Sequence, residues 1–125
     1  MRRMTDAVRQ PAVAGRWYPD SPAALAAAVD AFVEAAGRRR FRAPVALVAP
    51  HAGLLYSGSI AAQAYAQAPP DIEVVVLVGP SHYVAFAGAA LQRRGAFQTP
   101  LGAVEIHDGV ADRLIAASAI VHDNP

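Results

Sequence analysis

The chain contains no cysteine and no lysine, and all 11 of its basic residues are arginines. Without cysteine, disulfides and thiolate metal ligands are excluded within these 125 residues. No apolar run approaches the roughly 20 residues of a membrane-spanning helix, and the N-terminus lacks the apolar core of a signal peptide. The formal charge of +1 provides no electrostatic footprint for nucleic acid. We therefore expect a cytoplasmic protein with neither a membrane nor a nucleic acid as partner.

Apolar residues are abundant, at 54 % of the chain, which is sufficient to build a hydrophobic core. The length fits one domain, and we expect residues 1–125 to form it. The one basic run, at residues 38–42, follows a predicted helix, where cations favour the helix dipole. We interpret this run as a solvated helix end, with an anionic partner as the alternative.

Local signals predict three helices. Ser21 and Pro22 are typical of an N-cap and a first helical position, and the apolar spacing that follows predicts a helix over 22–36. A second helix, rich in small residues, is predicted over 58–68. Asp108 is expected to cap a third helix, which carries Val110 and Leu114 on one side.

Two short apolar runs, 44–50 and 72–78, are typical of strands buried on both faces. With the helix between them they predict a βαβ unit with parallel strands. Weaker patterns indicate a strand over 86–91, a turn-rich extended excursion over 95–106 and a strand that begins at 120–121. The predicted fold is α/β, a three-layer α/β/α arrangement with a largely parallel central sheet.

His51 directly follows the first predicted parallel strand, and His82 follows the second just as closely. Ligands of open parallel sheets bind beyond the carboxyl ends of the strands, and neighbouring strands lie roughly 4.8 Å apart. Two imidazoles rooted there can reach one metal ion. The alternative is that each histidine is a loop residue bonded to a neighbour, and the spacing leaves both interpretations open. A catalytic centre also needs a third protein ligand, whereas His107 and His122 are expected at the surface.

Several other side chains near the two histidines are candidates for catalysis or ligand binding. Tyr56 is a candidate proton donor, or else a tyrosine at the core edge with its hydroxyl in water. Trp17 either walls a binding cleft or packs under the first helix. Ser57 and Ser81 form no evident catalytic triad but are candidates for ligand binding. Phosphate-binding loops, dinucleotide-binding glycine motifs and the nucleophile elbow of hydrolases are absent from the sequence.

Four sequence blocks, taken together and in order, resemble the signature motifs of the Memo family, whose prokaryotic members are called AmmeMemoRadiSam system protein B. The blocks lie at 14–19, at 49–53 with 56–58, at 79–82, and at 97–102 with 104–106. This resemblance implies a fold similar to that of class III extradiol dioxygenases, in which a non-haem iron lies at the sheet edge. It also implies that His51 and His82 bind the metal, while Tyr56 and Trp17 line the pocket.

Members of that family are longer than this chain, and their other metal-site residues, a His and a Cys, are implied to lie outside the matching part. We therefore expect this chain to be the N-terminal portion of a longer domain. The implied function is a metal-dependent, dioxygenase-like redox enzyme that uses Fe(II), with copper as the alternative. A small molecule or a peptide would be its ligand, and the family name associates it with a radical SAM system.

Two further functions compete with the enzyme. The first is a non-catalytic module that binds a phosphorylated peptide or another anion through Trp17, the helix start near Ser57 and the two histidines. The second is a truncated product without an independent function.

Overall fold

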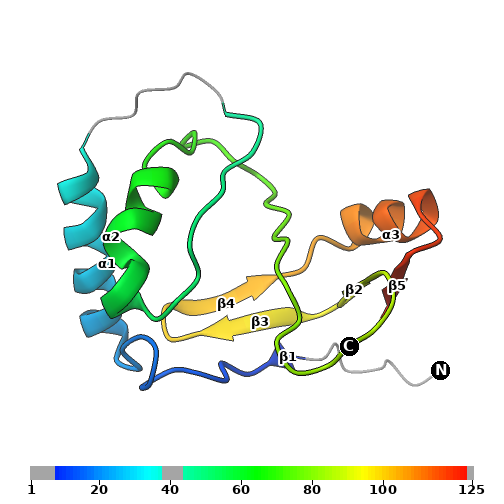
Figure 1. Ribbon diagram of the computed structural model, residues 1–125, viewed down its shortest axis with the longest axis horizontal. Helices are drawn as coiled ribbons and strands as arrows, with labels where there is room; N and C mark the ends of the chain where they lie inside the picture. The colour runs from blue at the N-terminus through cyan, green and yellow to red at the C-terminus, as the bar shows by residue number, and fades with distance from the viewer. Residues whose placement is uncertain (1–7, 38–43, 124–125) are drawn as a thin grey trace. The chain divides into compact units, whose positions relative to one another are not determined.

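The computed structural model describes residues 8–37 and 44–123, so the basic run at 38–42 lies outside the described residues (Figure 1). The chain divides into two compact units, one of Pro11–Glu73 and one that joins Met1–Gln10 to Val74–Pro125. Within the described ranges, no helix has the length and apolar character needed to cross a bilayer.

The unit Pro11–Glu73 is built on two helices that pack side by side, α1 (Pro22–Ala36) and α2 (Leu54–Tyr65) (Figure 1). The bounds of α1 are those predicted from the sequence. Ser21 Oγ accepts the N–H of Ala24 over 3.4 Å, as expected of an N-cap, and Gly37 follows the helix with a φ of 77°. Local signals were sufficient at α1 because its start and its end are both encoded within a few residues.

The second helix begins at Leu54, about one turn before the predicted start at Gly58. Its N-cap is Gly53, which provides no capping side chain, so the sequence carries no polar start signal at this point. Gly58 instead lies where α2 approaches α1. A Cβ placed there would lie 2.7 Å from Cε2 of Phe32, so the absence of a side chain permits the close packing of the two helices.

The second unit contains a three-stranded sheet in the order β1 (Val8–Arg9), β3 (Ala96–Thr99), β4 (Gly102–Glu105). The β1–β3 pair is parallel and the β3–β4 pair is antiparallel. The extended excursion predicted over 95–106 is therefore a β-hairpin. Thr99 closes its turn, since Oγ1 donates to the carbonyl of Gly102 over 2.8 Å and accepts the N–H of Leu101 over 3.1 Å.

Strands β2 (Ala89–Leu91) and β5 (Val121–Asp123) of the same unit form a parallel pair, linked through α3 (Asp108–Ala117). The predicted third helix and the strand expected from 120–121 are thus confirmed. Asp108 is not the cap, because Nδ1 of His107 accepts the N–H of Val110 over 3.3 Å and makes His107 the N-cap. His107 and His122 are both exposed, as expected.

The α/β class is confirmed, and two of the three described strand pairings are parallel. The predicted parallel strands at 44–50 and 72–78 are wrong for the described structure, in which both segments are irregular. A strand exists only where a neighbouring strand exchanges hydrogen bonds with it, and none of the strand pairings in the described ranges involves either segment. The βαβ unit expected from them is therefore not formed.

Candidate functional site

The turn that carries His51 is attached to the segment that carries Trp17. The N–H of Leu54, the first residue of α2, donates to the carbonyl oxygen of Trp17 over 2.7 Å. Gly53 makes this approach possible, because a Cβ at that position would lie 3.3 Å from the same carbonyl oxygen. Two of the blocks that define the sequence resemblance therefore meet in one unit.

Ser57 makes a second hydrogen bond to the same turn. Its side chain is buried, and its hydroxyl donates to the carbonyl oxygen of Ala52, the residue after His51, over 2.9 Å. The bond fixes the main chain beside His51 against the first turn of α2. Ser57 was predicted to bind a ligand, and its observed contact is a bond to the main chain of the histidine turn.

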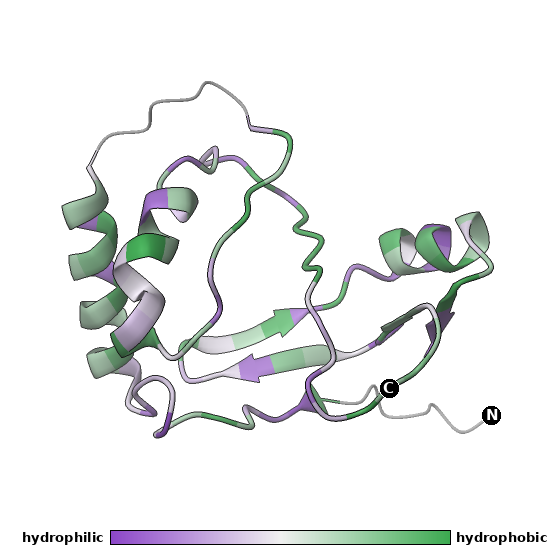
Figure 2. Cartoon of the chain, in the orientation of Figure 1, coloured by the Kyte–Doolittle hydropathy of each residue, from purple (hydrophilic) through white to green (hydrophobic). Residues whose placement is uncertain are grey.

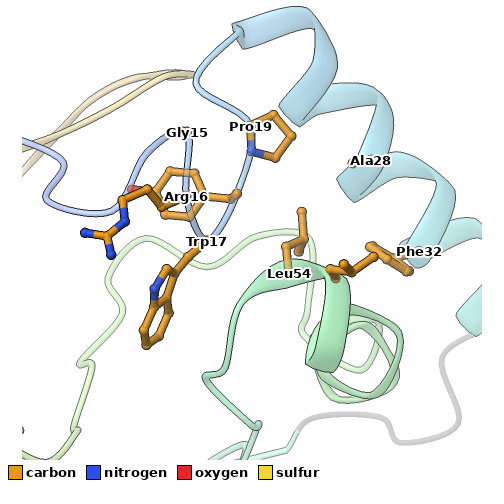
Figure 3. Close-up of a pocket in the computed structure, with 9 residues that line it drawn as sticks. Gly15, Arg16, Trp17, Pro19, Ala28, Phe32 and Leu54 are labelled. Atoms are coloured by element: carbon orange, nitrogen blue, oxygen red, sulfur yellow. The ribbon is translucent and has the colours of Figure 1, made fainter.

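Trp17 lines a pocket of about 370 Å³ between the segment before α1 and the two helices of its unit. Figure 3 shows Arg16 and Trp17 on one side of it, and Phe32 and Leu54, from α1 and α2, on the other. Its volume lies in the range of small-ligand sites, and its lining is largely apolar. Arg16 and Phe32 were not among the predicted site residues. For Arg16, the only sequence signal was its position next to Trp17. Phe32 carried no such signal, because its spacing in the predicted helix is typical of a core residue.

Tyr56 lies in the first turn of α2, and 82 % of its surface is exposed. It is accordingly not a core-edge tyrosine, and its phenol extends towards solvent, one position from Ser57. His51, two residues before the N-cap of the same helix, is also exposed. The Pro11–Glu73 unit thus holds Trp17, His51, Tyr56 and Ser57.

His82 belongs to the other unit and lies in a turn closed by Ser81. The hydroxyl of Ser81 donates to the carbonyl oxygen of Val84 over 2.6 Å and accepts the N–H of the same residue over 3.3 Å. The His82 ring packs edge-on to that of Tyr83, with centroids 6.4 Å apart. Each candidate histidine therefore sits in an exposed turn whose main chain is tied by a serine hydroxyl.

The described ranges contain no group of three His, Cys, Asp or Glu side chains able to hold a metal ion. A cluster of ion pairs lies in the other unit, where Arg93 and Arg94 contact Asp108 and Asp112 of α3. The hydrogen bond from Arg93 lowers the pKa of Asp112, with Arg94 acting in the same direction against desolvation. These exposed pairs fix α3 to the chain after β2 and contain no predicted site residue.

Residues 9–125 match the family described as Memo-like protein. A MEMO1 family protein of Methanothermobacter thermautotrophicus is 35 % identical over 126 residues, which cover 91 % of this chain and 44 % of the relative. Another, from Pyrobaculum aerophilum, is 36 % identical over 128 residues, with 94 % and 45 % covered. Protein MEMO1 of Xenopus tropicalis is 40 % identical over 94 residues, with 74 % and 31 % covered. The chain thus spans less than half the length of these relatives.

Proposed function

This chain belongs to the Memo family, and from that premise we propose that His51 and His82 are ligands of a divalent metal ion in a dioxygenase-like redox site. Fe(II) is the proposed ion, with copper as the alternative. Association with a radical SAM system and a cytoplasmic location remain predictions drawn from the resemblance and the composition.

The observation that supports this proposal is the way in which the histidine turns are held. Ser57 ties the main chain next to His51 over 2.9 Å, and Ser81 closes the turn around His82 over 2.6 Å. Rigid placement of a ligand's backbone reduces the entropy lost when its imidazole binds a metal. Both imidazoles are exposed, so an ion can reach them from solvent.

The chemistry of the donors fits iron or copper, because neutral imidazole is a common ligand of both. Their number does not complete a site, since a non-haem iron centre takes three protein ligands and the described ranges hold no cluster of three. This chain therefore contributes part of the ligand set. A bound redox metal would supply electron transfer, and the exposed phenol of Tyr56 would donate a proton to the substrate.

Anaerobic titration with Fe(II), followed by equilibrium dialysis and iron analysis, tests the proposal. We expect the parent to bind iron and the double variant His51→Ala/His82→Ala to bind it at least about tenfold more weakly. His122→Ala, which removes another exposed imidazole in β5, is the matched control and should bind as the parent does. Equal iron binding by the double variant and the parent would rule the metal site out.

A second candidate function, recognition of an anionic peptide without turnover, is favoured by the Trp17 pocket. Arg16 is the one charged residue that lines this pocket, while Phe32 and Leu54 provide apolar walls. A side chain that combines a flat apolar body with an anionic end, such as phosphotyrosine, matches that combination.

Titration with a phosphotyrosine peptide in the presence of a chelator separates the two functions. Trp17 is the only tryptophan in the chain, so its fluorescence reports directly on the pocket. Binding that survives chelation and is lost in Arg16→Gln, but not in Arg113→Gln, supports the peptide module. Binding abolished by the chelator supports a metal-centred site instead.

A further inference from the structure

Strand β4 forms one edge of the sheet β1–β3–β4, and all four of its residues are exposed. β3 lies along one side of it (Figure 1), and no strand among residues 8–37 and 44–123 pairs with the other side. Proteins protect open edges with lysine, proline or a bulge. β4 has none of these, since its register with β3 is continuous and its one charged residue, Glu105, stands at its end. Figure 2 shows the strand as neutral to hydrophobic up to that hydrophilic end. The edge is therefore accessible to strand addition.

The register of the β3–β4 hairpin determines which main-chain groups of β4 face outwards. The N–H of Ile106 donates to the carbonyl oxygen of Gly95 over 2.9 Å, so these two residues form a hydrogen-bonded pair of the ladder. Hydrogen-bonded and non-hydrogen-bonded pairs alternate along an antiparallel ladder. Val104 therefore bonds to β3, whereas the main-chain N–H and C=O groups of Ala103 and Glu105 point away from it.

A two-fold axis at Val104 makes these outward groups self-complementary. Antiparallel pairing about this axis places Ala103 of each copy opposite Glu105 of the other, and both residues then exchange main-chain hydrogen bonds. We propose that two copies of this chain form a homodimer by pairing β4 with β4 in this register, which gives a continuous sheet with three strands from each copy.

Neither neighbouring register fits as well as this one. An axis at Glu105 would place two carboxylates directly opposite each other, which is unfavourable. An axis at Ala103 would place Glu105 opposite Leu101, whose N–H is already bonded to Oγ1 of Thr99 in the turn. The axis at Val104 pairs the outward groups of both residues and opposes no like charges.

The side chains on one face of the sheet favour the same register. Arg9, Phe97 and Val104 are direct partners across the three strands, and the Arg9 guanidinium lies 5.8 Å from the centre of the Phe97 ring. Pairing about Val104 extends this row across both copies and brings the Cα atoms of the two valines within about 4.5 Å. Each valine, 60 % exposed in a single copy, then covers the other. The two guanidinium groups lie at opposite ends of the row, roughly 24 Å or five strand spacings apart, where salt screens their repulsion.

The same register also places Ile106 of one copy opposite Gly102 of the other. A Cβ at Gly102 would have no heavy atom within 4 Å beyond its chain neighbours, so the space above this residue is open. The half-buried Ile106 side chain of the second copy fills it and is covered in turn. Because one short strand of each copy forms the contact, we expect a dimer that dissociates on dilution.

Sedimentation velocity over a concentration series tests the dimer, because residue 104 meets its own copy at the axis. We expect a monomer–dimer equilibrium in the parent, weakened at least about tenfold in Val104→Lys and in Val104→Glu, since like charges would face each other. An equimolar mixture of the two variants should dimerise again, because an ammonium group then faces a carboxylate; this restoration also shows that both variants fold. Val8→Lys, at a 48 % exposed valine on the opposite edge of the sheet, is the matched control and should dimerise as the parent does.

Hydrogen exchange of the parent identifies the edge that is covered. The N–H groups of Ala103 and Glu105 should exchange more slowly at high protein concentration than at low, whereas the N–H of Val104, already bonded to β3, should change little. Three results would overturn the proposal. They are a parent that stays monomeric over the whole series, self-association that both charged variants retain, and a mixture of the two variants that remains monomeric.

Discussion

The N–H of Leu54 donates to the carbonyl oxygen of Trp17 over 2.7 Å, and this bond joins the start of α2 to the segment before α1. The donor, Leu54, follows His51 by three residues. The acceptor belongs to Trp17, whose side chain lines the pocket. A main-chain hydrogen bond therefore connects the segment of the proposed metal ligand, His51, to the pocket lined by Trp17. A change in either segment is expected to affect both.

Removal of the Ser57 hydroxyl should weaken metal binding at His51. In Ser57→Ala the carbonyl of Ala52 loses its 2.9 Å hydrogen bond, and the His51 turn is free to move. We expect metal affinity to fall by about tenfold, the lower end of the range for lost outer-shell partners. Ser59→Ala, an exposed neighbour on the same helix, is the control for Fe(II) titration. Equal affinities in the two variants would show that the Ser57 hydrogen bond does not position His51.

Adding a methyl group at Gly58 should destabilise the α1–α2 pair. The new Cβ would lie 2.7 Å from Phe32 Cε2 and 3.0 Å from Leu54 Cδ1. Overpacking of this kind costs about 1–3 kcal/mol, more than the gain in helix propensity. Gly109→Ala is the matched control in α3, because its nearest atom lies at 3.5 Å and alanine is the better helix former. Thermal unfolding should show a lower midpoint for Gly58→Ala only, and an unchanged midpoint would contradict the close packing.

We predict that the His107 side chain stabilises the protein by capping the N-terminus of α3. Loss of its Nδ1, which accepts the N–H of Val110 over 3.3 Å, should reduce stability by about 1 kcal/mol in His107→Ala. His107→Asn supplies another side-chain acceptor at the N-cap and should restore most of the loss. Urea unfolding followed by circular dichroism measures both variants. Equal losses in the alanine and asparagine variants would mean that His107 does not act as the cap.

Acid should weaken the attachment of α3 through Asp112. Hydrogen bonds from Arg93 and then Arg94 hold the pKa of Asp112 below its ordinary value of 3.8. The unfolded chain therefore takes up a proton first as the pH falls. The stabilisation is complete above the ordinary pKa and is lost as the pH falls through the lower, folded pKa.

Chemical unfolding measured from about pH 6 down to about pH 2 tests this dependence. Stability should fall less steeply with acid in Asp112→Asn than in the parent. Arg93→Gln should also flatten the curve, since it removes the largest cause of the shift. Arg113→Gln, which alters an arginine within α3 itself, is the control and should show the same pH dependence as the parent. Identical curves for the parent and Asp112→Asn would refute the role of this pair.

The candidate site was only partly accessible to sequence reasoning. Their positions after the predicted strands first identified His51 and His82, and the motif order then supported these two together with Trp17 and Tyr56. Their metal and catalytic roles remain predictions. The contact between Trp17 and Leu54 could not be predicted, because a main-chain hydrogen bond leaves no residue-type signature. Arg16 and Phe32 became pocket residues only once α1 and α2 were packed together.

The sequence alone determined α1, because Ser21, Pro22 and Gly37 encode both ends of that helix within a few residues of it. The order of short motifs also indicated the family, and the match over residues 9–125 confirmed it. Tertiary structure alone decided that 44–50 and 72–78 are not strands, because a strand depends on a partner distant in sequence, and the described ranges provide none. Helices satisfy their own main-chain hydrogen bonds, whereas strands need a neighbour, and this difference separates what could be predicted here from what could not.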